Sequence, residues 1–338
     1  HQDFLERLKT LVVSGQVELV GSAAYHGLLP LLPPEETVRQ IGENEAILKR
    51  FLGVSRPDGF FLPEMAYSPA VAKLIKEAGY RWLILDEAAA SGSGLDPEKI
   101  YKDEASGLEI VFRNRQLSNS FPPDRLISLI GTGSENGGGM PVAITATDAE
   151  LYGLRHEDPT GEMEKIAASP EIRTMAVSSW IREKQGQEPE ILRLSASSWE
   201  SGPDDVAAGR PFFLWEDRKN PIQKKLWELA RLALSLDGRY RMDANYYWYR
   251  WHLVRGLASC TFWWASAHDF SKVFGPYAWN PDYVERGLGD LVRSIRSLDA
   301  PDSKKYKLKA EKLRLQAEEA LWKEHWRRHW LPIPAVKI

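Results

Sequence analysis

The chain has 338 residues, of which 43% are hydrophobic and 27% charged, so it can bury a globular core and is neither disordered nor of low complexity. Its formal net charge of −3 gives no reason to expect a nucleic-acid partner, and it contains no apolar run long enough to span a membrane. The only cysteine, Cys260, excludes an internal disulfide framework and a cysteine-based zinc site. Thirteen tryptophans are an unusual number, and their rings suit both core packing and stacking on sugars.

The first half of the sequence alternates helix-like and strand-like segments at the spacing of βα units. Helices are predicted at residues 3–14, 34–51 and 69–77, and strands at residues 17–20, 59–63, 82–86, 108–112, 140–146 and 190–194. This alternation predicts a parallel sheet, either open or closed into a barrel. In such folds the reactive side chains lie just past the carboxyl ends of the strands. Those positions hold His26, Glu64, Asp86, Arg113, Asp148, Glu150, Trp199 and Glu200.

The remainder of the chain is predicted to be helical. Helical patterns cover residues 221–236, 244–265, a segment that begins at Pro281, and 302–330. A loop-rich stretch separates the two parts. We therefore expect a domain over residues 1–200, a connecting loop over residues 201–220, and a helical domain over residues 221–338.

Two acidic segments follow predicted strands. Glu64 comes directly after Pro63, and a carboxylate held in this way has the fixed position that a nucleophile requires. The same position also suits a glutamate that caps the next helix or pairs with an arginine. Asp148 and Glu150 point to the same side if the chain is extended there, although they could also simply cap a loop. Glycosidic cleavage uses two carboxyl groups, one ionised and one protonated.

Four segments, in the same order, resemble the motifs of glycoside hydrolase family 57, a family of α-glucan hydrolases and transferases. They are residues 15–32 (GQVELVGSAAYHGLLPLL), 59–67 (GFFLPEMAY), 148–153 (DAELYG) and 255–264 (RGLASCTFWW). The resemblance implies an α/β fold, an incomplete (β/α)7 barrel followed by a helical domain that completes the substrate cleft. The family's first motif ends in His-Gln-Pro and is not found before Gly15, so we expect the chain to lack the first βα unit of the barrel.

The resemblance also implies a retaining mechanism in which Glu64 is the nucleophile and Asp148 the general acid and base. Six further residues are predicted to bind substrate, namely His26, Arg113, Glu150, Trp199, Trp263 and Trp264. Each tryptophan suits core packing equally well, and His26 could instead make a structural hydrogen bond. Arg113 could steady a carboxylate, or equally lie at the surface. The chemistry requires no cofactor, and no metal site is expected.

The predicted function is that of a hydrolase or transglycosylase acting on α-glucosidic bonds of an oligo- or polysaccharide. One alternative is a non-catalytic carbohydrate-binding or regulatory protein on a degenerate barrel. Another is a metal-dependent polysaccharide deacetylase, which needs an aspartate and two histidines near the strand ends. The only pair with the required His-x-x-x-His spacing, His325 and His329, lies in the terminal helix. A single cysteine and no visible export signal favour a cytoplasmic location.

Overall fold

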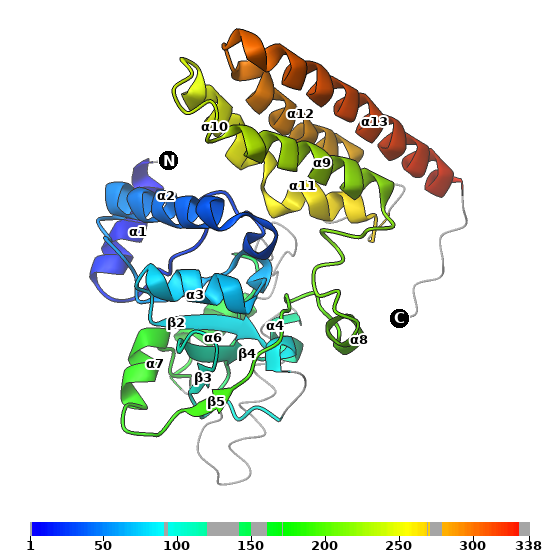
Figure 1. Cartoon of the computed structure of the whole chain (residues 1–338). Helices are drawn as coiled ribbons and strands as arrows, with labels where there is room; N and C mark the ends of the chain where they lie inside the picture. The colour runs from blue at the N-terminus through cyan, green and yellow to red at the C-terminus, as the bar shows by residue number, and fades with distance from the viewer. Residues whose placement is uncertain are drawn as a thin grey trace. The chain divides into compact units, whose positions relative to one another are not determined.

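The computed structural model describes residues 2–90, 94–119, 142–149, 161–170, 172–268, 270 and 279–330 (Figure 1). The chain divides into two compact units, which are described separately. Unit 1 comprises His1–Ala24 and Leu29–Pro211, and unit 2 comprises Tyr25–Leu28 and Phe212–Ile338. The division after Pro211 lies inside the segment 201–220, whereas the assignment of Tyr25–Leu28 to unit 2 departs from the expected boundaries.

Unit 1 combines a five-stranded sheet with helices. The strands are β1 (Gly59–Phe61), β2 (Trp82–Asp86), β3 (Tyr101–Asp103), β4 (Glu109–Arg113) and β5 (Glu190–Leu192). The helices are α1 (Gln2–Val13), α2 (Pro34–Leu52), α3 (Pro69–Glu77), α4 (Arg115–Asn119), α6 (Glu162–Ala168), α7 (Val177–Glu183) and α8 (Pro203–Ala207). Short 3-10 turns occur at η1 (Leu29–Leu31), η2 (Pro63–Met65) and η3 (Glu87–Ala90).

The sheet is mixed rather than wholly parallel. Its strand order is β1-β2-β4-β3-β5, and β1, β2 and β4 are parallel as predicted. Strand β3, which the sequence analysis missed, is antiparallel to β4, and β5 is parallel to β3. The connection from β3 to β4 is too short for a parallel crossover. It turns at Gly107, whose φ of 70° is left-handed, and the Asp103 carboxylate accepts hydrogen bonds from the backbone of Ala105 and Ser106.

Two predicted strands are reduced or lost. The strand expected at residues 17–20 is limited to one parallel bridge, between Gly21 and Phe60. In the strand expected at residues 140–146, the described residues 142–146 form no regular strand. Ser118 and Asn114 take the hydrogen-bonding positions there, because Asn114 N donates to Ile144 O at 2.7 Å and Ala146 N donates to Ser118 Oγ at 3.2 Å.

The buried centre of unit 1 lies against β2. A hydrophobic cluster is formed by Met65, Trp82, Ile84, Ile100, Val111 and Ile181. Helix α7 is held on this cluster by the Trp82 indole, whose Nε1 donates to Ser178 Oγ at 2.9 Å. The Glu18 carboxylate accepts from Ser178 N at 3.0 Å and so caps the first turn of the same helix.

Unit 2 is helical in the residues that the structure describes. Its elements are α9 (Pro221–Leu236), α10 (Tyr246–Gly256), α11 (Ser259–Trp263), η5 (Trp264–Ser266), α12 (Pro281–Ser297), η6 (Pro301–Ser303) and α13 (Lys304–His329). Helices α12 and α13 run side by side (Figure 1). None of the described helices is long and apolar enough to cross a membrane.

The helix predicted over residues 244–265 is broken between α10 and α11. Ala258 is extended and forms an antiparallel bridge with Gly27, and Ser259 N donates to His26 O at 2.9 Å. The short segment Tyr25–Leu28 therefore occupies the break. At the end of α10, Gly256 packs against α12 so closely that a Cβ at this position would lie 2.6 Å from Leu291 Cγ.

Candidate active site

Glu64 lies in a strained turn at the carboxyl end of β1. Its φ is 59° and that of Met65 is 47°, both in the left-handed region that side chains rarely adopt. The turn is closed by Met65 N donating to Leu62 O at 2.8 Å, and the Glu64 side chain is only 8% exposed. Such strain costs about 1–3 kcal/mol per residue and is concentrated at functional sites. The strained turn therefore marks Glu64 as a candidate functional residue.

Trp199 makes two hydrogen bonds to Glu64, one from its side chain and one from its backbone. Its indole Nε1 donates to Glu64 Oε2 at 2.9 Å, and its backbone N donates to Glu64 O at 3.1 Å. The two residues are 135 positions apart in the sequence. The segment that carries Trp199 is aligned with the β1 turn by an antiparallel bridge between Tyr67 and Ser197. The indole thus stabilises a carboxylate whose orientation is set by a distant part of the chain.

A buried group of charges lies at the ends of the next two strands. Asp86 ends β2 and Arg113 ends β4, and the two residues are in register across the parallel pair. Arg113 Nε donates to Asp86 Oδ2 at 2.8 Å, and Arg115 Nη2 donates to Asp86 Oδ1 at 2.5 Å. Asp86 is 1% and Arg113 is 3% exposed. Two guanidinium groups therefore satisfy one buried carboxylate, and Asp86 keeps one cationic partner if the other is removed.

Arg113 also contacts the segment that leads to Asp148 and the tryptophan that donates to Glu64. Its Nη1 donates to Ala146 O at 2.8 Å, and its Cζ lies 5.2 Å from the centre of the Trp199 ring. Ala146 and Trp199 both pack against the cluster that contains Met65, the neighbour of Glu64. Asp148 is half-buried and follows Ala146 by two residues, a stretch that spans at most about 7 Å. Arg113 therefore links the segment before Asp148 to the tryptophan that donates to Glu64.

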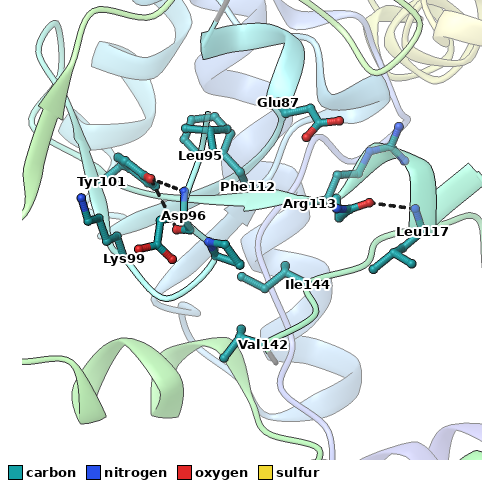
Figure 2. Close-up of a pocket in the computed structure, with 12 residues that line it drawn as sticks. Glu87, Leu95, Asp96, Lys99, Tyr101, Phe112, Arg113, Leu117, Val142 and Ile144 are labelled. Atoms are coloured by element: carbon teal, nitrogen blue, oxygen red, sulfur yellow. Dashed lines mark hydrogen bonds between the residues drawn. The ribbon is translucent and has the colours of Figure 1, made fainter. Parts of the chain in front are cut away.

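A solvent-open pocket adjoins this arrangement in unit 1 (Figure 2). It has about 480 Å³ of empty space, and its lining includes Arg113, Asn114 and Ile144. Figure 2 shows Glu87 beside Arg113, with Asp96, Lys99 and Tyr101 on another side of the pocket. Glu64 and Trp199 are not among its lining residues. The pocket is thus next to Arg113 and is not centred on Glu64.

The remaining described candidates belong to unit 2. His26 has a φ of 56°, and its backbone O accepts from Ser259 N. Trp263 and Trp264 are half-buried, with ring centres 6.3 Å apart, and both line a small pocket. The Trp264 ring stacks on Tyr283 at 4.5 Å, so one of its faces is already used within the protein.

Glu150 lies outside the described residues, so its predicted role is neither supported nor opposed. Among the residues that the structure describes, no group of three or more His, Cys, Asp or Glu side chains is placed to hold a metal ion.

The contacts that support Glu64 and Asp86 were not predicted from the sequence. Arg115 was not singled out, although its spacing of two from Arg113 after a strand was a usable signal. Glu18 lies inside the first motif segment, and its structural role as a cap of α7 has no local signature. The Trp199 indole bond to Glu64 has none either, because the two residues are so far apart in the sequence.

Comparisons with known proteins point to one family. The model of glycosyl hydrolase family 57 matches residues 1–158. Alpha-amylase 1 of Dictyoglomus thermophilum is 32% identical over 164 residues, which are 46% of this chain and 23% of that protein. A 1,4-alpha-glucan branching enzyme of Thermococcus kodakarensis is 28% identical over 220 residues, covering 54% of this chain and 32% of that enzyme.

Solved structures of enzymes from this family share the fold. The 4-alpha-glucanotransferase from Thermococcus litoralis superposes with a TM-score of 0.64 at 18% identity, over 88% of this chain and 51% of that one. A GH57 branching enzyme from Thermococcus kodakaraensis gives a TM-score of 0.64 at 17% identity, over 95% of this chain and 74% of that one. The resemblance inferred from the four motifs is confirmed. The chain spans about a quarter to a third of the two curated relatives.

Proposed function

From its relationship to glycoside hydrolase family 57, we propose that this chain carries the active site of a retaining enzyme acting on α-glucosidic bonds of oligo- or polysaccharides. The matched relatives are named as α-amylases, a branching enzyme and 4-α-glucanotransferases, so the chain is related to both hydrolases and transferases. We also propose that the five-stranded sheet is part of an incomplete (β/α)7 barrel. The similarity in fold to the two solved enzymes supports that architecture.

The observation that carries this proposal is the fixed carboxylate of Glu64. It follows a parallel strand, is nearly buried, and accepts a hydrogen bond from the Trp199 indole. In the proposed first step, the Glu64 carboxylate forms a bond to the anomeric carbon while the glycosidic C–O bond breaks. Asp148 gives its proton to the departing oxygen, so that an alcohol leaves and a glycosyl ester remains on Glu64.

The second step reverses the roles. The Asp148 carboxylate takes a proton from an incoming hydroxyl, whose oxygen bonds to the anomeric carbon as the ester bond to Glu64 breaks. Water as the incoming group gives hydrolysis, and a sugar hydroxyl gives transfer. Both steps require the two carboxyl groups to be about 5–5.5 Å apart. Asp148 must also hold a proton before the first step, which the nearby negative charge of Glu64 would favour.

For the substrate, we propose that aromatic faces supply much of the binding. Trp263 and Trp264 expose part of their rings, and a pyranose stacks on an indole face. His26 and Glu150 remain candidates for hydrogen bonds to sugar hydroxyls. No cofactor enters the proposed chemistry.

The test is the Glu64→Gln variant with maltoheptaose as substrate and chromatography of the products. Gln keeps the size of the side chain and can still accept from the Trp199 indole, but it is a very poor nucleophile. We expect turnover to fall by at least about 1,000-fold, as in other enzymes that lose their nucleophile. Glu77→Gln, on the exposed end of α3, is the control and should behave as wild type. Near-normal turnover by Glu64→Gln would refute the proposal.

A further inference from the structure

Arg113 makes three contacts that no other described residue combines. Its Nε bonds to Asp86 at the end of β2, its Nη1 bonds to Ala146 O, and its guanidinium lies against the face of the Trp199 ring. These contacts come from three separate parts of the chain. Arg113 is only 3% exposed, so its guanidinium is surrounded by protein and not by solvent.

We propose that Arg113 is a positioning residue that fixes the two acids relative to each other. This inference rests on the proposed function. Arg113 acts on Glu64 through Trp199, whose indole Nε1 donates to the Glu64 carboxylate. It acts on Asp148 through the carbonyl of Ala146, two residues earlier in the chain. Of the roles that the sequence suggested for Arg113, this one extends the steadying of a carboxylate and takes the place of a substrate contact.

The shape of the guanidinium explains why arginine is needed. Its planar group presents several N–H donors at fixed angles and a flat face that stacks on an aromatic ring. One edge can therefore bind Asp86 while another reaches Ala146 O and the face contacts Trp199. A lysine at this position could reach one of these partners well but not all three. Displacing a reacting group by about 1 Å can cost roughly 100-fold in rate.

Arg115 provides a matched control in the same charge group. It donates to the same Asp86 carboxylate, but its other bond is to Ser201 O at 2.9 Å and not to Trp199 or Ala146. The Ser201 loop has its own anchor, since Ser201 Oγ donates to Pro211 O at 2.7 Å. Arg115→Met therefore removes a cation from Asp86 while leaving intact the link between the two acids.

The experiment compares Arg113→Met, Arg113→Lys and Arg115→Met on two substrates. One is maltoheptaose, whose departing sugar needs a proton from Asp148. The other is 4-nitrophenyl α-maltoheptaoside, with release of 4-nitrophenolate as the readout, because this leaving group departs without help from an acid. The ratio of kcat/KM values for the two substrates thus reports how well Asp148 is placed, and a role in folding alone does not alter it.

For Arg113→Met we expect kcat/KM to fall by about 100-fold on maltoheptaose and by about 10-fold on the nitrophenyl substrate. The loss on maltoheptaose should appear mainly in kcat. Arg113→Lys should recover part of the loss on the nitrophenyl substrate and little on maltoheptaose. Arg115→Met should stay within about threefold of wild type on both substrates.

Equal losses on the two substrates in Arg113→Met, or a loss no greater than that of Arg115→Met, would overturn the inference. If Arg113→Met does not fold, the double variant Asp86→Asn/Arg113→Gln removes both charges of the buried pair and must give the same substrate dependence. The proposed function fails separately, through normal turnover in Glu64→Gln. If the wild-type chain forms no product from either substrate, both proposals fail.

Discussion

The carboxyl ends of β1, β2 and β4 are held together by residues far apart in the sequence, whereas α9 and α12 begin at caps made by their own neighbours. Glu64 and Trp199 are separated by 135 positions. In contrast, Asn220 Oδ1 accepts from Ile222 N at 2.9 Å, only two positions later, and Asn280 starts α12 in the same way. Each cap precedes a proline at the first helical position. The helices of unit 2 are thus specified locally, and the acids of unit 1 are placed by tertiary structure.

The largest expected effect concerns Asp148. Asp148→Asn keeps the shape of the side chain but cannot cycle a proton, so turnover of maltoheptaose should fall by about 10²–10⁴-fold. The nitrophenyl substrate should be affected much less in its first step, which gives a burst of nitrophenolate followed by slow turnover. Stopped-flow absorbance would detect the burst. A variant that loses activity equally in both phases and on both substrates would contradict the acid role.

Two indole hydrogen bonds, one in each unit, test the difference between the units. Trp199 Nε1 donates to the Glu64 carboxylate at 2.9 Å, and Trp279 Nε1 donates to the neutral ring of His325 at 3.0 Å. Trp199→Phe should lower kcat/KM by about 10–100-fold, since a hydrogen bond to a charged group contributes about 1.5–3 kcal/mol. Trp279→Phe should leave kcat unchanged and lower Tm.

Measurement of kinetics and melting for both variants separates a site contact from a core contact. The expected difference between the two units would be contradicted if Trp199→Phe changed only Tm, or if Trp279→Phe reduced kcat as strongly as Trp199→Phe.

A smaller effect is expected at the helix cap of α12. Asn280→Ala removes the side-chain acceptor of two backbone N–H groups and should destabilise the protein by about 1 kcal/mol, with kcat unchanged. Urea unfolding followed by circular dichroism measures the change. Asn280→Asp, which retains the acceptor, is the control and should remain close to wild type. A loss of stability in both variants would show that the cap is not the cause.

The smallest effect is a dependence of stability on pH. Burial lowers the pKa of His325 below its usual 6.5, with His329 as a second cause, so the folded state binds its proton less readily than the unfolded chain. Unfolding then takes up a proton, and the free energy of unfolding decreases as the pH falls below 6.5. His325→Gln should remove this part of the decrease between pH 7 and pH 5. Parallel pH profiles of Tm for wild type and variant would contradict the expectation.

Much of the fold follows from local pattern. Strand β2 has the predicted bounds, and α3 begins at Pro69 with Ser68 Oγ accepting from Val71 N, as the Ser-Pro pair predicts. The sequence also predicted that Glu64 follows the first strand of the sheet, although β1 ends at Phe61 and Pro63 begins a 3-10 turn instead of ending the strand. These features depend on residues within a few positions of one another.

The predictions that were wrong or incomplete share one cause, which is that the structure there depends on contacts between residues far apart in the sequence. Residues 142–146 look like a strand, but their hydrogen bonds go to Asn114, Ser118 and Arg113. Strand β3 has three residues, too few to show a periodic pattern. The sequence suggested that Arg113 could steady a carboxylate but did not identify its partners, because they are dispersed over the first 200 positions. Tertiary hydrogen bonds of this kind leave no periodic signature in the sequence.

The most direct test of the central claim is to trap the glycosyl intermediate. The chain is incubated with a 5-fluoro-α-glucosyl fluoride, which forms the ester faster than it is hydrolysed, and the digested protein is analysed by mass spectrometry. The account predicts one added glycosyl group on the peptide that contains Glu64, and none in Glu64→Gln. A label on a different carboxylate, or cleavage of maltoheptaose that gives β-anomeric products without any label, would contradict it.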